Sequence, residues 1–118
     1  HFIEVGHDWS PGNIALLMNA ADCLIFASRY EGSPCVVQEA LACTCPLVTV
    51  DVGDIRDLTG TLPGVDIVER DADALAAAVV SRLSNAMRVN VPDSIREARF
   101  EVLAQRIMPL FKSLVRRP

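Results

Sequence analysis

The sequence predicts an α/β fold of the Rossmann-like type, in which a parallel sheet lies between two layers of helices. Three short apolar runs, 23–27, 47–50 and 65–68, do not alternate with polar residues. The segments between these runs carry the signals of helices. Strands that are buried on both faces and joined by crossover helices are typical of a three-layer parallel sheet.

The first elements are a short strand over 2–5 and a helix that begins after Ser10. A serine hydroxyl can accept a hydrogen bond from a first-turn N–H, and a proline such as Pro11 suits the first helical position. After this helix, the run 23–27 indicates the first buried strand. The apolar residues of the helix that begins after Ser10 have the spacing of a single helix face: Ile14, Leu17, Met18 and Ala21.

The same signal, Ser33 followed by Pro34, predicts a second helix over 34–43. The first-turn N–H groups of Cys35 and Val36 would then have no partner within the helix. Together with the positive end of the helix dipole, these groups favour a phosphate. Gly32, just before the cap, permits either an unusual backbone conformation or the close approach of a ligand.

The remaining elements alternate in the same way. A strand over 47–50 leads to a helical turn over 55–58, which Asp54 would cap, and then to a strand over 65–68. A helix starts at Ala72 with Asp71 as its cap, and Pro92 would break it. A last helix over 94–118 is expected to kink at Pro109. We expect residues 1–118 to form a single, partial domain. The expected apolar side of the helix from Ala72 comprises Leu75, Ala76, Val79, Val80 and Leu83.

Two carboxylates flank the start of the helix over 34–43. Glu31 precedes the cap, and Glu39 lies five residues after Pro34, which is roughly 7.5 Å along a helix axis. An ionised carboxylate only accepts hydrogen bonds and can hold two neighbouring hydroxyl groups. Beside a phosphate site, this pair would suit a sugar that is attached to a diphosphate.

This region resembles the nucleotide-sugar-binding domain of the GT-B-fold retaining glycosyltransferases, of the group 1 or family 4 type. The closest similarity is to bacterial enzymes that build exopolysaccharides and cell-wall glycans. It extends from about residue 6 to residue 57, with a looser fit onward. The segments that carry it are 20–22 (AAD), 28–34 (SRYEGSP), 38–43 (QEALAC), 46–48 (PLV) and 51–54 (DVGD).

The resemblance implies a role for each residue of the motif. Glu31 would contact the donor hexose as an orienting and electrostatic catalytic residue, and Glu39 would bind the ribose. The donor would be a nucleotide diphosphate sugar, and the helix start would stabilise the charge that develops on the leaving nucleoside diphosphate. No metal ion and no other cofactor is expected. The donor-binding segment also includes Pro34, and its backbone contacts would come from Gly32, Ser33, Cys35 and Val36.

The resemblance also implies a function and partners. A hexose would be transferred, with retention of configuration, to a glycan or lipid-linked acceptor. The chain would be the C-terminal portion of a donor-binding domain, without the N-terminal acceptor domain and without the first two strands of a sheet of order 3-2-1-4-5-6. Alone, the chain is then expected to be inactive, and its open sheet edge would favour self-association.

Two other classes of protein remain open. One is a different GT-B enzyme, such as a sugar-nucleotide epimerase or a phosphorylase-like enzyme. The only lysine, Lys112, is poorly placed for the pyridoxal phosphate that a phosphorylase would need. The other class is a non-catalytic module for nucleotide-sugar binding or assembly, against which the intact pair of Glu31 and Glu39 argues.

Two residues depart from the family pattern. Thr44 stands where glycine or asparagine is common. Either this β-branched residue is strained in the left-handed position after the helix, or the helix ends differently. Cys45 replaces an aliphatic residue, which a small apolar thiol can imitate. Cys23, Cys35, Cys43 and Cys45 all fall in buried-looking positions, which favours structural thiols in a reducing compartment. A disulfide, or a reactive Cys35 at the helix start, is the alternative.

The charge of the chain favours neither nucleic acid nor an anionic membrane as a partner, because 11 basic and 15 acidic residues give a net charge of -4. No leader and no membrane span is visible, so the expected location is the cytoplasm. Cations collect in the tail, where we expect a solvated helix face; the alternative is docking to the inner membrane face or to the missing domain. These cations are Arg96, Arg99, Arg106, Lys112, Arg116 and Arg117.

Overall fold

The computed structural model describes residues 1, 3–4, 9–85, 87–92, 105, 107–109 and 112. Three strands form one parallel sheet: β1 (Leu24–Phe26), β2 (Leu47–Val50) and β3 (Val65–Val68). They lie in sequence order, β1-β2-β3, with β2 in the centre. This order agrees with the last three strands of the arrangement that the resemblance implied.

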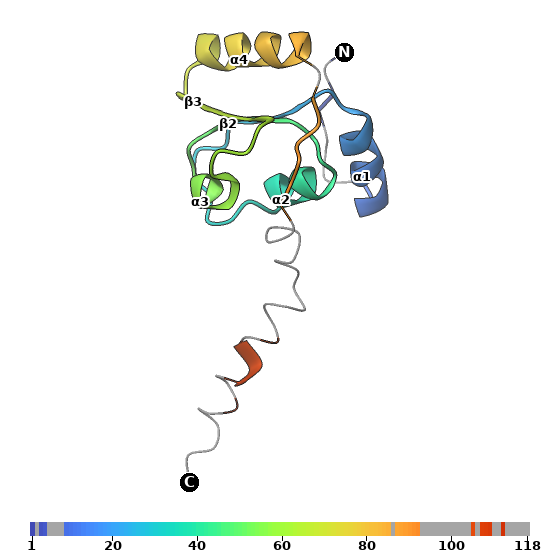
Figure 1. Ribbon diagram of the computed structural model, residues 1–118, viewed down its shortest axis with the longest axis vertical. Coiled ribbons are helices and arrows are strands. Elements are labelled where there is room, and N and C mark those ends of the chain that lie inside the picture. The colour runs from blue at the N-terminus through green and yellow to red at the C-terminus, as the bar shows by residue number, and fades with distance from the viewer. Residues whose placement is uncertain are drawn as a thin grey trace.

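Four helices accompany the strands: α1 (Pro11–Ala20), α2 (Cys35–Ala42), α3 (Ile55–Thr59) and α4 (Ala72–Ser84). Figure 1 shows α4 on one face of the sheet and α2 and α3 on the opposite face, with α1 beside α2. The predicted three-layer α/β architecture, with a Rossmann-like parallel sheet, is therefore confirmed.

The core lies mainly between the sheet and the layer of α2 and α3. Every residue of β2 is buried, whereas the residues of β1 and β3 are half-buried. A second cluster joins α1 to α2 through Met18, Ala40 and Cys45. The side of α2 that faces the sheet is thus fully enclosed, which leaves its N-terminus and its outer side for other contacts. The buried residues of the main cluster are Val37, Leu41, Leu47, Ile55, Val89 and Val91.

Local cap signals predicted two helix starts correctly. The Ser10 hydroxyl accepts a hydrogen bond from the Asn13 N–H at 3.2 Å, at the start of α1. The Asp71 carboxylate accepts from the N–H groups of Asp73 and Ala74, at 3.0 and 3.1 Å, at the start of α4. Such caps satisfy first-turn donors that have no partner inside the helix.

The expectation that Pro92 ends α4 was wrong, because the helix ends at Ser84. The chain then returns to the sheet, and the Val89 N–H donates to the Thr44 carbonyl at 3.0 Å. Val89 and Val91 are buried in the main core. The burial of two valines in this non-helical segment is favourable, and it favours a helix that ends well before the proline.

The strain predicted at Thr44 is confirmed, since its φ is 54°. The Thr44 N–H donates to the Leu41 carbonyl at 2.9 Å, and the Cys45 N–H donates to the Ala40 carbonyl at 2.8 Å. These two bonds form a Schellman motif, which normally has glycine at this position. Cys45 is buried against Ala40 and Met18, as an aliphatic residue would be.

Two of the expected elements fall largely on residues outside those described. Of the strand expected over 2–5, only residues 3 and 4 are described, and they belong to no strand. Of the helix expected over 94–118, residues 105, 107–109 and 112 are described, and they are helical. Pro109 is described, but residues 106, 110 and 111 around it are outside the described part of the chain, so the expected kink stays a prediction. Most of the tail cations also lie outside the described part.

Candidate functional site

The candidate site lies at the edge of the sheet where the three parallel strands end. The loops that leave β1, β2 and β3 meet there. The Asp54 N–H of the second loop donates to the Gly32 carbonyl of the first at 3.0 Å. Arg70 of the third loop donates from Nη1 to the carbonyls of Ala27 and Ser28, at 3.1 and 2.6 Å. Ligands of open α/β sheets bind at this carboxyl edge.

The turn that carries Glu31 is open to solvent. Tyr30 is 90% exposed, and Glu31, Gly32 and Ser33 are also exposed. Pro34, which follows them, is buried. Among the described residues, the Glu31 side chain makes no hydrogen bond or ion pair, so its carboxylate is free to accept bonds from a ligand.

The start of α2 differs from the prediction by one residue. The helix begins at Cys35, and Pro34 rather than Ser33 is the N-cap, so no side chain caps it. The Pro34 carbonyl accepts from the N–H groups of Val37 and Gln38, at 3.1 and 3.4 Å. The Ser33 hydroxyl instead accepts from Nε2 of Gln38 at 2.8 Å, because that side chain reaches back over the first turn.

Although α2 begins one residue later than predicted, the N–H groups expected to bind an anion are still those of its first turn. No described group accepts a hydrogen bond from the N–H of Cys35 or Val36, the first two residues of α2. Glu39 lies one turn further along, about 6 Å from Cys35 on the axis, and its side chain is exposed. Side chains on a helix lean toward its N-terminus, so Glu39 leans toward the same end as these donors.

One part of the expectation for Gly32 was wrong. Its φ is not positive, and a Cβ atom added there would meet nothing within 4 Å. The residue therefore does not serve an unusual backbone conformation. The other interpretation, that Gly32 leaves room for a ligand to approach the backbone, stays a prediction.

The glycine that the backbone requires is Gly53, in the loop after β2. Its φ is 60°, and an added Cβ atom would lie 2.3 Å from the Gly32 carbonyl oxygen. The neighbouring Asp54 occupies the predicted N-cap position of α3, but its side chain makes no capping bond. Among the described residues, Oδ1 of Asp54 is buried without a hydrogen-bond partner. The loop after β2 therefore packs its backbone directly against the turn of Glu31.

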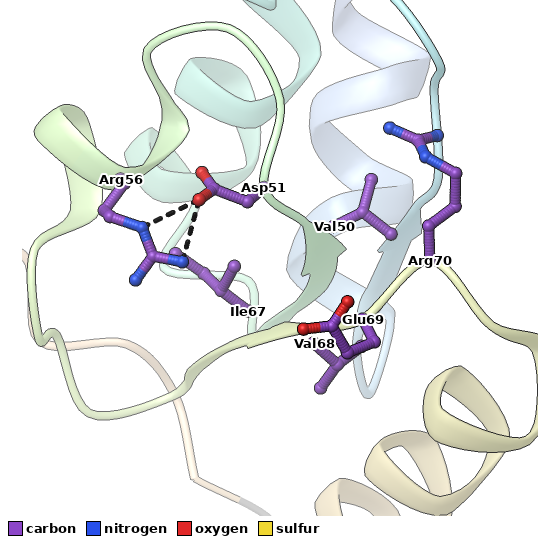
Figure 2. A pocket seen from close by; sticks show the side chains of 7 residues that line it. All are labelled: Val50, Asp51, Arg56, Ile67, Val68, Glu69 and Arg70. Carbon is purple, nitrogen blue, oxygen red and sulfur yellow. Dashed lines mark hydrogen bonds and ion pairs between the residues drawn. The ribbon is translucent and has the colours of Figure 1, made fainter.

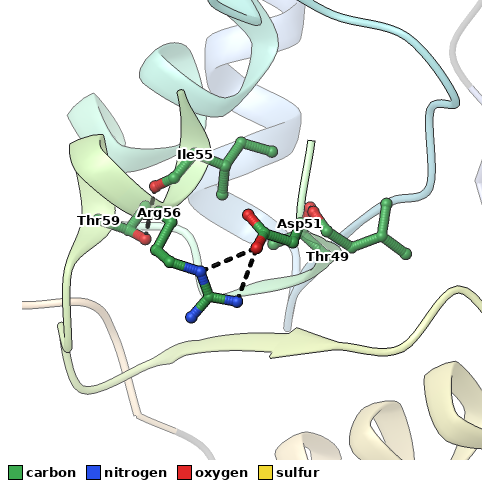
Figure 3. Close-up of polar contacts among 6 residues, drawn as sticks. Thr49, Asp51, Ile55, Arg56 and Thr59 are labelled. Atoms are coloured by element: carbon green, nitrogen blue, oxygen red, sulfur yellow. Dashed lines mark hydrogen bonds and ion pairs between the residues drawn. The ribbon is translucent and has the colours of Figure 1, made fainter. Parts of the chain in front are cut away.

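A cavity of about 440 Å³ opens beside this loop, at the ends of β2 and β3 (Figure 2). Asp51 and Arg56 face each other across part of it, with Oδ2 2.9 Å from Nε and 2.8 Å from Nη2. Figure 3 shows this pair together with the buried Thr49 and with the hydrogen bond from the Thr59 hydroxyl to the Ile55 carbonyl, which is 2.8 Å long. The seven lining residues are Val50, Asp51, Arg56, Ile67, Val68, Glu69 and Arg70.

Sequence reasoning missed Glu69 and Arg70 at this edge. Both follow the predicted strand over 65–68 directly, and charged residues that follow a buried parallel strand lie at the carboxyl edge of its sheet. This pattern was therefore sufficient to predict Glu69 and Arg70 at this edge. The contact of Arg70 with the two residues after β1 could not have been predicted, because it joins residues 42 and 43 positions apart.

The four cysteines are all free thiols. Of the four expected buried positions, only that of Cys45 is buried; Cys23 and Cys43 are half-buried, and Cys35, the first residue of α2, is exposed. Burial raises the pKa of the Cys45 thiol, and burial with help from Asp22 raises the pKa of the Cys23 thiol. These two thiols therefore stay protonated at neutral pH.

In the part of the chain that the structure describes, no helix is long and apolar enough to cross a membrane. Among the same residues, no three side chains of His, Cys, Asp or Glu lie together in a way that could hold a metal ion.

The fold and the helix start at the carboxyl edge place the chain among Rossmann-like α/β proteins. Comparison with known families is more specific, because residues 5–85 match the family described as "Glycosyl transferases group 1". The chain therefore belongs to this family, and Glu31, Glu39 and the turn between them all lie inside the matched region.

One relative is TuaC of Bacillus subtilis (strain 168), which is provisionally named a teichuronic acid biosynthesis glycosyltransferase. The two proteins are 42% identical over 60 residues, which are 51% of this chain and 15% of TuaC. The matched stretch is thus a small part of that relative. No solved structure gives a significant match to the chain.

Proposed function

We propose that this chain forms the donor-binding part of a glycosyltransferase that uses a nucleotide diphosphate sugar. The protein would transfer a hexose to a hydroxyl group of a glycan or lipid-linked acceptor, with retention of configuration. Membership of the glycosyl transferases group 1 family supports glycosyl transfer as the reaction class. The donor, the retention and the acceptor are inferred from the site residues and from the resemblance.

The observation that carries the proposal is the junction of β1, the Glu31 turn and α2. A parallel strand ends, an exposed turn follows, and α2 begins with two N–H groups that no described residue occupies. Helix N-termini bind phosphate because these donors and the helix dipole both favour negative charge. The diphosphate of the donor would lie there, and the same groups would stabilise the charge on the leaving nucleoside diphosphate.

The two glutamates would recognise the sugar rings on either side of the diphosphate. Both side chains are exposed and have no partner among the described residues, so neither needs to break a bond before it accepts a hydroxyl. Glu31, on the turn, would hold and orient the hexose. Glu39, on α2, would hold the ribose. The chain alone would bind the donor, and transfer would need acceptor-binding residues that we do not assign to it.

The test is a titration of the ¹⁵N-labelled chain with UDP-glucose, GDP-mannose and the free nucleoside diphosphates, followed by amide chemical shifts. We expect shifts at residues 32–36. We expect Glu39→Ala to weaken binding by about 10- to 100-fold, because a hydrogen bond to a charged group contributes about 1.5–3 kcal/mol. Asp22→Ala is the matched control, since it removes an exposed carboxylate from the opposite edge of the sheet.

Gly32→Ala separates ligand contact from folding. The added methyl group meets nothing within 4 Å and the φ is not positive, so the stability of the chain should not change. If the donor lies against this backbone, the methyl group will block it, and binding will weaken while the thermal midpoint stays the same. Donor binding that is unaffected by both Gly32→Ala and Glu39→Ala would overturn the proposed site.

A further inference from the structure

The exposed turn with Glu31 is held by its two ends and not by burial. Between Ser28 and Pro34, every residue has an exposed side chain or is an exposed glycine. An exposed segment without core contacts is expected to be mobile unless hydrogen bonds fix it. The direction in which Glu31 points therefore depends on what holds the chain just before and just after it.

The downstream end is fixed by the loop after β2. The Asp54 N–H donates to the Gly32 carbonyl, and Gly53 lies against the same carbonyl at a distance that only glycine allows. These are backbone contacts, and they hold the turn at the residue that follows Glu31.

The upstream end is fixed by one side chain, that of Arg70. Its Nη1 atom donates to the carbonyls of Ala27 and Ser28, the two residues that follow β1. Figure 2 shows the Arg70 side chain extending from the loop after β3 toward the chain that leaves β1. Since β1 pairs with β2 alone among the described strands, its end has little other support on the far side.

We propose that Arg70 is a positioning residue for Glu31, and this inference rests on the proposed function. Arg70 fixes the direction in which the chain leaves β1 and so sets where Glu31 meets the donor hexose. Hydrogen bonds from a charged donor are the stronger kind, and here both come from a single nitrogen atom. A lysine ammonium, which is also a single nitrogen with several N–H groups, can therefore replace it in part.

The experiment compares Arg70→Ala, Arg70→Lys and the control Arg56→Ala. Arg56 lines the same cavity and carries the same charge, but it pairs with Asp51 and makes no described contact with β1 or the turn. Without ligand, ¹⁵N relaxation and amide shifts report the order of residues 29–33. With UDP-glucose or GDP-mannose as the probe, the dissociation constant reports donor binding, and thermal unfolding reports global stability.

We expect Arg70→Ala to increase fast motion in residues 29–33 and to weaken probe binding about tenfold, while the core amides keep their shifts. Arg70→Lys should recover most of both effects, and Arg56→Ala should change binding less than twofold. Arg70→Met, which keeps the aliphatic stem, replaces the alanine variant if that variant does not fold.

The inference is overturned if the ligand-free turn is unchanged in Arg70→Ala, or if Arg56→Ala weakens binding as much. The first result would mean that Arg70 does not position the turn, and the second that it acts only through its charge. If the unmodified chain binds no nucleoside diphosphate hexose, the proposed function fails, whereas the ligand-free relaxation still decides whether Arg70 holds the turn.

Discussion

At Gly53 the backbone lies so close to the Glu31 turn that a single methyl group would separate two loops. The added Cβ atom would lie 2.3 Å from the Gly32 oxygen and 3.1 Å from the Glu31 oxygen. Both oxygens belong to the backbone and cannot move aside as a flexible side chain would. The identity of residue 53 therefore determines the position of a carboxylate more than 20 residues earlier in the chain.

We expect Gly53→Ala to destabilise the chain by more than about 3 kcal/mol, because left-handed strain of about 1–2 kcal/mol adds to the steric overlap. Gly60→Ala is the control, since Gly60 also has a positive φ, of 53°, but has nothing within 4 Å of an added Cβ atom. It should cost about 1–3 kcal/mol from strain alone, because its φ of 53° and ψ of -121° lie in a region that residues other than glycine rarely adopt. Urea unfolding measures the free energy of unfolding of both variants. Equal decreases would show that the close approach of the two loops does not contribute to the cost of Gly53→Ala.

Thr44 shows how the fold tolerates a residue that its backbone conformation does not favour. Its hydroxyl accepts from Nε of Arg88 at 3.4 Å, and its carbonyl accepts from the Val89 N–H. Both partners come from the segment that returns to the sheet after α4. The sequence indicated the strain, but it could not indicate these partners, because they lie 44 and 45 positions away.

At the scale of single elements, polar contacts hold both the start and the last turn of α4. None of its residues is buried, and Val80 and Leu83 are 64% and 54% exposed. Arg82 on α4 and Asp66 on β3 form an ion pair, with Nε 2.9 Å from Oδ2. The Asp71 cap fixes the other end. A helix with so little burial is expected to open before the rest of the fold.

We expect Arg82→Met to increase hydrogen exchange of the α4 amides about tenfold, which corresponds to about 1.4 kcal/mol of local stability. The pair is half-buried, with side chains 11% and 33% exposed. The Arg56 and Asp51 pair is the matched control, because its side chains are 63% and 51% exposed. Exposed pairs contribute little, so Arg56→Met should change exchange in α3 less than twofold. Equal effects in the two helices would contradict this account.

The start of α2 shows why a local signal predicts a helix but not its first residue. The dipeptide Ser-Pro occurs at 10–11 and at 33–34, and only the first serine caps its helix. The hydroxyl of the second serine instead accepts a hydrogen bond from the side chain of Gln38, which lies one turn further along the chain. Competition between two acceptable partners for one hydroxyl depends on rotamers, which the pattern of residue types does not determine.

At the scale of the whole molecule, Arg88 joins segments that the strands do not join. Its guanidinium donates to the carbonyls of Met18, Ala21 and Cys43, at 3.0, 2.8 and 2.8 Å. These carbonyls lie at the C-terminal ends of α1 and α2, where cations are favourable. One side chain thus ties two helices to the segment that follows α4.

We expect Arg88→Ala to lower the free energy of unfolding by about 2 kcal/mol, because exposed carbonyls regain water and offset part of the lost bonds. Arg88→Lys should lose about half as much, since an ammonium cannot reach all three carbonyls at once. Arg29→Ala is the control, as an exposed arginine without a described hydrogen bond, and should change stability by less than about 0.5 kcal/mol. Urea unfolding measures these changes. The prediction would be contradicted if Arg88→Ala and Arg29→Ala had the same free energy of unfolding.

Between residues 11 and 84, the sequence was sufficient for the order and type of the elements, because buried strands and caps are local patterns. β2 and β3 begin and end where the apolar runs do. The contacts that complete the candidate site and the core were not predictable in this way. Arg70 with Ala27, Gly53 with Gly32, and Val89 with Thr44 each depend on how two distant segments are packed.

The two anchors of the Glu31 turn also impose an order on folding. Both come from later in the chain than the turn, and Arg70 follows Ser28 by 42 residues. Contacts between distant residues form late, because the intervening chain must first be brought into place. The loop with Glu31 therefore acquires its native direction only after β2 and β3 have joined the sheet. A nascent chain that ended before β3 would carry Glu31 on a turn without its upstream support.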